Sequence, residues 1–278
     1  ECEFVEEVAA ELPLIAILEL MGVPADERKQ FYDWTNSMIF AEDPDMAISQ
    51  DEANVAAFQM IEYAMGMAER HKEQPLDNIT GALLNGEIDG RPVTTEEFGW
   101  MWLLTMVGGN ESTRTVISQG MRLLMEHPDQ LQYLVDNPDK IADAVEEILR
   151  YNTAFICMRR TAIEDVEFDG HEIKAGDKII LHYHCANHDE SVFGEDALCF
   201  DVCRAERMPD LHNQHRAFGI GQHFCIGSHV ARLELRVMFE EIIPRLRNPR
   251  LVSAPEFVKS FFINGIKRMP IVFDPETA

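Results

Sequence analysis

The chain has 278 residues, of which 24 are lysine or arginine and 49 are aspartate or glutamate, giving a formal net charge of −25 at pH 7. This acidity argues against a nucleic-acid partner or an anionic membrane surface. No apolar run approaches the ~18 residues that a membrane-spanning helix needs. The 6 cysteines lack the spacing of a disulfide framework and indicate reduced thiols in a cytoplasmic protein.

Helical patterning dominates the first part of the chain. Residues 4–21 should form a helix that Pro13 bends and Gly22 ends. Glu27–Phe40 and Asn54–Glu73 are further helical stretches, with an acidic loop between them. Methionine and aromatic side chains recur at helical spacing in both stretches. Such stripes fit either a packed core or an adaptable apolar lid over a substrate, and both interpretations stay open.

A long helix is predicted from Thr94 to about Met125. Thr94 and Glu97 form a capping box at its start. The stretch Trp100–Val107 is apolar almost all round, which predicts a buried central position. A helix of ~30 residues would be ~45 Å long at 1.5 Å per residue.

The middle of this helix breaks two local rules. Gly108 and Gly109 each cost about 1 kcal/mol relative to alanine in a helix interior. The nearby Glu111 carboxylate is costly on an apolar helix unless it is paired or solvated. Such coincidences are typical of functional sites, where missing side chains make room for a flat cofactor or for dioxygen. A kinked helix with a surface glutamate is the other interpretation.

Short helices and then short strands follow. Pro128–Val135 and Pro138–Arg150 are predicted helices, and Glu147 and Arg150 lie three residues apart, where they can pair on one face. Glycine-containing turns then predict hairpins. The predicted strands are Val166–Phe168, His171–Lys174 and Lys178–Tyr183, and a last hairpin joins Phe257–Ile263 to Ile266–Phe273 through the turn Asn264-Gly265.

Three glycines surround one cysteine in the segment Phe218-Gly-Ile-Gly-Gln-His-Phe-Cys225-Ile-Gly227. Glycine permits positive φ and lets a backbone approach a flat ligand closely. Apolar residues recur at helical spacing immediately afterwards, so Cys225 lies where a tight loop enters a helix. The N–H groups at a helix start favour an anion, which predicts a lowered pKa for the Cys225 thiol and a thiolate able to bind iron.

Cys225 has two other interpretations, a buried structural cysteine in a turn and a zinc site with His223 and His229. Zinc sites usually pair two such clusters. No Cys-x-x-Cys occurs anywhere in the chain, so zinc is the weakest of the three interpretations.

The whole pattern Phe-Gly-x-Gly-x-His-x-Cys-x-Gly resembles the haem-binding loop of the cytochrome P-450 family, the haem-thiolate monooxygenases. The resemblance implies that Cys225 is the axial metal ligand of haem b. It also implies that His223 and Arg160, which precedes Thr-Ala, hold the haem propionates. The residues expected around the cofactor are Phe218, Gly219, Gly221, His223, Cys225, Gly227, Arg160, Gly108 and Gly109.

The glycine-containing helix resembles the family's oxygen-activation helix, in which a small residue, a glycine, an acid and a hydroxyl follow in order. Gly108, Gly109, Glu111 and Ser112 match that order. The family's usual hydroxyl is threonine, so Ser112 is a departure, with Thr113 next to it. A serine hydroxyl still donates and accepts hydrogen bonds. The resemblance therefore implies a catalytic proton relay through Glu111 and Ser112 or Thr113.

Glu147 and Arg150 resemble the family's Glu-x-x-Arg helix, whose pair has a structural role and is joined by an arginine before the cysteine loop, here Arg204. The resemblance covers essentially the whole chain from Phe4. It implies a single domain, residues 1–278, that forms the C-terminal two-thirds of a mainly α fold with small β-sheets (α+β). The family's N-terminal strands and helices are expected to be missing.

The implied activity is hydroxylation of an unactivated C–H bond by O2 and two electrons from a ferredoxin or flavoprotein. A peroxide-driven peroxygenase would not need the relay at Glu111 and Ser112, and a non-catalytic haem-binding remnant is the third hypothesis. Opposite charges speed protein association, and a run of arginines predicts a basic docking patch for the electron donor near the cysteine. They are Arg204, Arg207, Arg216, Arg232 and Arg236.

The segments Gly-Gly-Asn-Glu and Phe-Phe-Ile-Asn-Gly-Ile-Lys resemble a bacterial branch that includes sterol side-chain and terpene-alcohol hydroxylases. The residues expected to face the substrate are apolar. They are Met38, Ile39, Phe40, Val107, Phe155, Ile156 and Ile263. An apolar pocket offers few polar groups to fix orientation. A steroid or terpenoid therefore fits better than a fatty acid, whose carboxylate would need a cation.

Overall fold

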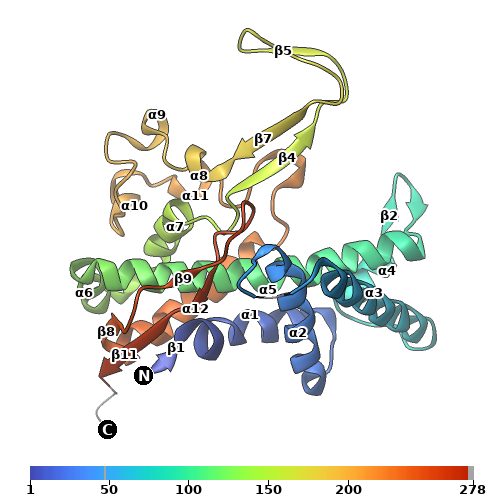
Figure 1. The fold of residues 1–278 in the computed structure, drawn as a ribbon, viewed down its shortest axis with the longest axis horizontal. Helices are drawn as coiled ribbons and strands as arrows, with labels where there is room; N and C mark the ends of the chain where they lie inside the picture. The colour runs from blue at the N-terminus through green and yellow to red at the C-terminus, as the bar shows by residue number, and fades with distance from the viewer. Residues whose placement is uncertain (47, 275–278) are drawn as a thin grey trace. The chain divides into compact units, whose positions relative to one another are not determined.

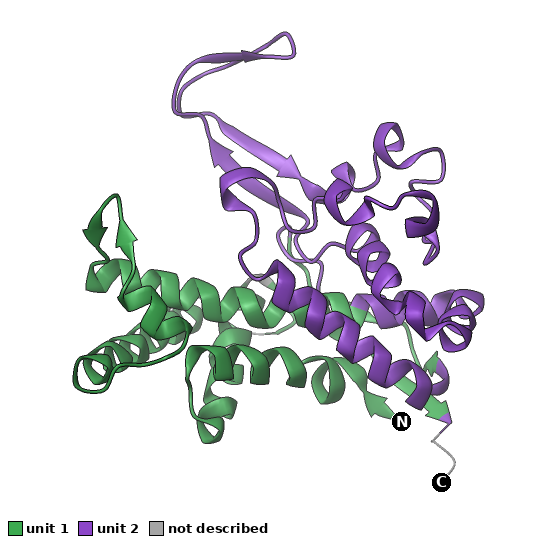
Figure 2. Cartoon of the chain, turned by 180° about the vertical axis from the view of Figure 1, so that it is seen from behind, with its two compact units in different colours: residues 1–118, 250–260, 266–273 green, residues 119–249, 261–265, 274–278 purple. Residues whose placement is uncertain are grey.

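The computed structural model describes residues 1–46 and 48–274 (Figure 1), which form two compact units (Figure 2). Unit 1 comprises residues 1–118, 250–260 and 266–273, and unit 2 comprises residues 119–249 and 261–265 with residue 274. The long helix α5 (Thr95–Glu126) runs from one unit into the other. Helices with small β-sheets make up both units, as the predicted fold class requires. Among the described residues, no helix has the length and apolarity to cross a bilayer.

Unit 1 is mostly helical. Its helices are α1 (Glu11–Met21), α2 (Arg28–Ile39), α3 (Gln50–Glu73), α4 (Ile79–Leu84) and α5 as far as Ser118, with a π-helical turn at Val5–Ala9. Its strands are β1 (Cys2–Glu3), β2 (Glu87–Ile88), β3 (Arg91–Pro92), β9 (Glu256–Phe257), β10 (Ile266–Arg268) and β11 (Pro270–Asp274). β1 pairs antiparallel with β11, so the first residues of the chain lie beside the last described strand (Figure 1).

The helix ends of unit 1 follow local side-chain chemistry. α1 ends at Gly22, whose φ of 76° is left-handed, as predicted. α5 begins with the predicted capping box, in which the Glu97 N–H donates to the Thr94 hydroxyl at 3.3 Å. α3 begins at Gln50 rather than at the predicted Asn54, because Ser49 and Glu52 form a second capping box.

The core of unit 1 packs α1, α2 and α3 against α5. Phe31, Met60, Met67 and Trp102 are all at most 1% exposed. The buried Trp102 indole N–H donates to the Thr80 hydroxyl at 2.9 Å, so its polar atom is satisfied. The core interpretation of the methionine stripe on α3 is therefore confirmed for its buried members.

Part of the apolar stretch on α5 is not buried. Trp100 and Leu104 are 54% and 73% exposed, while Trp102 and Met106 are fully buried. The prediction of burial all round the helix is therefore wrong for these two residues, because only one face of α5 packs against the core of unit 1.

Unit 2 contains the predicted short strands. Its helices are α6 (Pro128–Asp136), α7 (Ile141–Tyr151), α8 (Tyr183–Ala186), α9 (Glu190–Phe193), α10 (Arg204–Arg207), α11 (Leu211–Gln214) and α12 (Ser228–Arg245). Its strands are β4 (Cys157–Thr161), β5 (Val166–Phe168), β6 (His171–Ile173) and β7 (Lys178–His182), and β8 (Arg247–Leu251) follows α12. β5 and β6 form the predicted hairpin, which continues from the β4–β7 ladder (Figure 1). β7 pairs with β4 rather than with β6, so the second predicted turn does not form a hairpin of its own.

The predicted Asn264-Gly265 hairpin turn is wrong. A two-residue Asn-Gly turn needs positive φ at both residues, and neither is among the described residues with positive φ. β9 and β10 do pair, with Phe257 opposite Ile266, but residues 258–265 connect them. Ile263 instead forms a bridge to Phe155, and the Asn264 N–H donates to the Ala154 carbonyl oxygen at 2.8 Å. Tertiary pairing has overridden the local turn preference.

Candidate active site

The cysteine loop, residues 218–227, leads into α12, with Gly227 as the N-cap. Gly219 and Gly221 both have a φ of 73°, a conformation that residues with a Cβ rarely adopt. The Cys225 N–H donates to the Phe218 carbonyl oxygen at 2.9 Å, which closes the loop. The structure therefore contains the tight loop that the glycine pattern predicts, with Cys225 just before the helix start.

The Cys225 thiol is free and half-buried. Burial raises its pKa, while an N–H from Gly227 and the positive charge of Arg232 act in the opposite direction. The predicted lowering of the thiol pKa is therefore wrong for the protein chain alone. The loss of hydration raises this pKa by more than the Gly227 N–H and Arg232 lower it. Metal binding selects the thiolate, so the two favourable groups become relevant when a cation is bound.

Three residues around the cysteine loop are linked to one another, and we call Glu146 on α7, His215 just after α11 and Arg232 on α12 the loop-support cluster. Glu146 on α7 accepts hydrogen bonds from Arg232 Nε at 2.7 Å and Arg232 Nη2 at 3.0 Å. It also bonds to His215 Nε2 at 2.9 Å. The Arg232 guanidinium lies over the Phe218 ring, 4.6 Å from its centroid. Burial opposes ionisation of Glu146, but His215 and Arg232 hold the pKa of that carboxyl below its usual range.

Glu147, Arg150 and Arg204 form a network whose side chains are fully buried. Arg150 Nε and Nη2 donate to the two Glu147 oxygens at 2.7 and 2.8 Å, and Arg204 Nε donates to them at 3.0 and 3.2 Å. The other guanidinium N–H groups donate to carbonyl oxygens of the segment before α10. These are the carbonyls of Asn187, Phe193, Asp196, Ala197 and Cys199. The predicted three-residue contact is present, and it ties α7 to the segment that precedes the cysteine loop.

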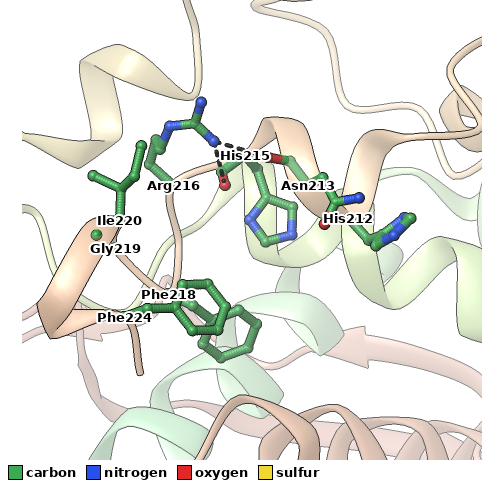
Figure 3. A pocket seen from close by; sticks show the side chains of 9 residues that line it. His212, Asn213, His215, Arg216, Phe218, Gly219, Ile220 and Phe224 are labelled. Atoms are coloured by element: carbon green, nitrogen blue, oxygen red, sulfur yellow. Dashed lines mark hydrogen bonds between the residues drawn. The ribbon is translucent and has the colours of Figure 1, made fainter. Parts of the chain in front are cut away.

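A cavity of about 390 Å³ opens beside the cysteine loop (Figure 3). The rings of Phe218 and Phe224 lie together on one side of it, with centroids 6.4 Å apart. Arg216 lies across from them and donates Nη1 to the Asn213 and His215 carbonyl oxygens, at 2.9 and 3.3 Å. This side of the loop therefore combines aromatic surface with one cation.

The two glycines of α5 have different surroundings. A Cβ at Gly108 would meet nothing within 4 Å, whereas a Cβ at Gly109 would come within 2.7 Å of the Ile17 side chain on α1. Gly108 is exposed and faces open space, and its place beside a cofactor stays a prediction. Gly109 instead permits close packing of two helices in unit 1, so its expected place beside the cofactor gains no support from its surroundings.

The Ser112 hydroxyl forms a hydrogen bond to the backbone of α5. It donates to the Gly108 carbonyl oxygen, one turn earlier, at 2.7 Å. Bonds of this kind compete with the helix ladder and often bend a helix. Thr113, the neighbouring hydroxyl, is 4% exposed. Ser112 is thus the more accessible of the two hydroxyls.

Glu111 is buried and paired, not on the surface. It is 4% exposed, forms an ion pair with Arg114 one turn later and accepts a hydrogen bond from the Thr115 hydroxyl at 3.3 Å. Arg114 also donates to Asn36 of α2 at 2.9 Å, and its guanidinium lies over the Phe40 ring. Burial raises the pKa of Glu111, although Arg114 and Thr115 act in the opposite direction. The surface-glutamate interpretation is therefore wrong.

The remaining predicted residues lie on several elements. Arg160 is a half-exposed residue of β4, opposite Ile179. Phe155 and Ile263 are brought together by a bridge, and Ile263 is 3% exposed. Ile156 is fixed beside them, because its N–H donates to the Phe262 carbonyl oxygen at 2.9 Å. In unit 1, Val107 lies on α5, and Met38 and Ile39 lie on α2. Phe40 follows α2 and is 4% exposed.

The predicted docking patch of five arginines is wrong as a group. Arg204 is fully buried, and Arg207 forms ion pairs with Asp196 and Asp201. Arg232 pairs with Glu146, and Arg236 with Glu240 at 3.7 Å. The prediction counted arginines that are close in sequence and left out the carboxylates that pair with them in the fold. Among the described residues, Arg216 is the member of the set that donates to carbonyl oxygens and forms no ion pair.

The residues of the cysteine loop are suited to hold a haem through a thiolate. The thiol is flanked in sequence by Phe224 and Ile226, which are 51% and 97% exposed, so apolar surface that suits a flat macrocycle adjoins it. A Cβ at Gly227 would meet the Cys225 sulfur at 3.9 Å, an ordinary van der Waals contact, so Gly227 lies directly beside the thiol. Within residues 1–46 and 48–274, no group of three His, Cys, Asp or Glu residues is placed to hold a metal ion, which leaves zinc without a ligand set.

Comparisons with known proteins agree with the cysteine loop. The family model for cytochrome P-450 matches residues 48–250. A steroid C26-monooxygenase of Mycolicibacterium smegmatis is 40% identical over 97% of this chain and 61% of its own length. A linalool 8-monooxygenase of Pseudomonas putida is 37% identical over 99% of this chain and 66% of its own length.

Solved structures share the fold. A Mycobacterium marinum cytochrome P-450 in complex with pseudoionone has a TM-score of 0.89 and 31% identity, over 98% of this chain and 65% of that chain. The chain spans 61% of the length of the steroid C26-monooxygenase that it matches. From the family match, the identity to these relatives and the shared fold, it follows that the chain belongs to the cytochrome P-450 family.

Proposed function

We propose that the protein is a haem-thiolate monooxygenase that hydroxylates an unactivated C–H bond of an apolar small molecule. The reaction consumes O2, two electrons and two protons, and releases the alcohol and one water. The observation that carries the proposal is the cysteine loop, in which Cys225 is a free thiol held just before α12 by left-handed Gly219 and Gly221. When bound, haem b supplies an iron centre whose thiolate ligand favours cleavage of the O–O bond.

The residues of the cysteine loop would bind and orient the cofactor. Cys225 would give the sulfur ligand, and the Gly227 N–H already interacts with that sulfur. His223 is exposed at the end of a short 3-10 helix, and Arg160 is half-exposed on β4, so both are available to donate to the two propionates. Phe218 is held by its contact with Arg232. These assignments rest on family membership together with the accessibility of each side chain.

Glu111 and Ser112 would move protons. Because burial raises the pKa of Glu111, this carboxyl takes up and releases a proton closer to neutral pH than an exposed glutamate does. The Ser112 hydroxyl donates its own proton to the Gly108 carbonyl oxygen, which leaves its lone pairs free to accept one. The buried Thr113 is the second candidate hydroxyl. A peroxide-driven reaction needs no such relay, so this pair favours an O2-dependent reaction.

The electrons would come from a ferredoxin or a flavoprotein. Arg216, at the cavity beside the cysteine loop, is the cation that the predicted docking patch retains. Its charge suits an acidic donor, and salt should slow the first electron transfer by screening that attraction. The 6 cysteines are all free, which supports a reducing compartment such as the cytoplasm.

The substrate would be a steroid or a terpenoid. Relatives named steroid C26-monooxygenase and linalool 8-monooxygenase share 40% and 37% identity with this chain. The residues that we expect to line the pocket are apolar, and they include Val107, Phe155, Ile156 and Ile263. Such a pocket binds by buried area, at ~25 cal/mol per Å², and suits a large apolar skeleton.

A spectral titration tests the substrate class. Haem-loaded protein is titrated with a sterol, a terpene alcohol and a fatty acid, and the low-spin to high-spin shift is followed at the Soret band. We expect the sterol or the terpene alcohol to give the tighter complete shift. A tight shift with the fatty acid alone would contradict the proposal. Product formation that requires the electron donor and is not supported by hydrogen peroxide separates a monooxygenase from a peroxygenase.

A further inference from the structure

The loop-support cluster connects a fixed charge to the cysteine loop by contacts within unit 2. Glu146 holds Arg232 by two hydrogen bonds, at 2.7 and 3.0 Å. Arg232 also donates to the His212 carbonyl oxygen at 3.1 Å, just before the loop. Its guanidinium then lies 4.6 Å from the centroid of the Phe218 ring. The Phe218 carbonyl oxygen in turn accepts a hydrogen bond from the Cys225 N–H at 2.9 Å. Phe218 therefore connects the cluster to Cys225.

His215 fixes the geometry of this cluster without adding a charge. Its Nδ1 accepts the Ala217 N–H at 3.2 Å, so the ring proton lies on Nε2, which donates to Glu146 at 2.9 Å. Burial lowers the pKa of His215, although Glu146 acts in the opposite direction. The side chain is 1% exposed, and those of Glu146 and Arg232 are 15% and 22% exposed. The carboxylate and the guanidinium therefore make up the charge of the cluster.

We propose that Glu146 and Arg232 are positioning residues for the thiolate ligand, and that their opposed charges set the reduction potential of the bound iron. This inference rests on the proposed haem-thiolate function. Arg232 brings a positive charge towards the thiolate, and Glu146 both holds that charge in place and partly neutralises it.

The two charges act on the potential in opposite directions. A positive charge near an iron–sulfur bond stabilises the reduced, more negative state of the centre and raises its reduction potential. Removing Arg232 should therefore lower the potential. Removing the Glu146 charge unmasks Arg232 and should raise it. A purely structural brace would make no such distinction, because loss of either partner would loosen the same loop in the same way.

The variants are chosen to keep size while changing charge. Glu146→Gln still accepts one hydrogen bond from Arg232, and Arg232→Met keeps the apolar stem that covers Phe218. Arg232→Lys keeps the charge but loses the bidentate geometry. The matched control is Arg236→Met, one turn later on α12. It removes the same charge as Arg232→Met, but from a residue that pairs with Glu240 at 3.7 Å.

The ferric–ferrous reduction potential is measured in the haem-loaded wild-type protein and in each variant. We expect a lower potential for Arg232→Met, a higher one for Glu146→Gln, a return towards wild type for Arg232→Lys, and little change for Arg236→Met. Shifts of the same sign for Glu146→Gln and Arg232→Met, or a shift of equal size in Arg236→Met, would overturn the inference.

A second measurement covers variants that do not retain haem. Alkylation of Cys225 by iodoacetamide is followed by mass spectrometry in the protein without haem, because the thiolate is the reacting species. Alkylation slower than wild type for Arg232→Met and faster for Glu146→Gln supports the inference, and equal rates contradict it. If the wild type gave no thiolate-type Soret band with carbon monoxide, the proposed function would fail. A normal band in the wild type, together with unchanged reduction potentials in the variants, would contradict only the present inference.

Discussion

Removal of the Glu147 charge should destabilise the protein by several kcal/mol. In Glu147→Gln the side chain keeps its shape, but Arg150 and Arg204 stay fully buried without the carboxylate that accepts 4 of their hydrogen bonds. Breaking a buried ion pair by removing one partner costs roughly 3–5 kcal/mol. Asp196 offsets part of this loss, because it accepts from Arg204 at 3.2 Å. We therefore expect the loss to lie near the lower end, about 3 kcal/mol.

Urea unfolding followed by far-UV circular dichroism measures this loss, from the shift in midpoint at a common slope. The matched control is Glu206→Gln, because Glu206 pairs with Lys140 at 3.2 Å on the surface, and its side chain is 52% exposed. Exposed pairs contribute roughly 0–1 kcal/mol. A loss in Glu147→Gln within about 1 kcal/mol of the loss in Glu206→Gln would refute the claim that this network braces the segment before the cysteine loop.

Three further outcomes follow from α5 and α12. Ser112→Ala should divert electrons from product to hydrogen peroxide, and product per electron left unchanged in both Ser112→Ala and Thr113→Ala would remove the relay. Alanine adds the same helix propensity at Gly108 and Gly109, so Gly109→Ala should be the less stable in urea by about 1–3 kcal/mol, the cost of overpacking; equal stability would contradict its packing role. Burial raises the pKa of Glu234 from 4.5 to about 7. Its ionisation therefore destabilises the fold as pH rises between these values, and Glu234→Gln should gain about 2–3 kcal/mol at pH 8 but nothing at pH 4; equal midpoint shifts at both pH values would argue against this.

Elements with local causes were predictable from the sequence. The start of α5 follows from Thr94 and Glu97, and the end of α1 follows from Gly22. The start of α3 was equally readable, because Ser49 and Glu52 carry the same capping pattern. The Asn264-Gly265 turn failed for the opposite reason: segments more than a hundred residues apart pair with this stretch, and no local preference indicates that pairing.

The candidate site divides in the same way. The cysteine loop is continuous in sequence, so its glycines and Cys225 could be recognised directly. The loop-support cluster is not, because Glu146 lies 69 residues from His215 and 86 residues from Arg232. Glu146 had one readable signal, its position next to Glu147. The partner of Glu111 was hidden differently, since Arg114 lies one turn away but a sequence does not reveal that both side chains are buried together.

The carbon monoxide spectrum of the reduced, haem-loaded protein reports which side chain binds the iron. If Cys225 binds the haem iron, the wild type gives the thiolate-type Soret band and Cys225→Ala loses it. Cys185→Ala, which removes an exposed thiol elsewhere in unit 2, should keep the band. A thiolate-type band that persists in Cys225→Ala would contradict the account.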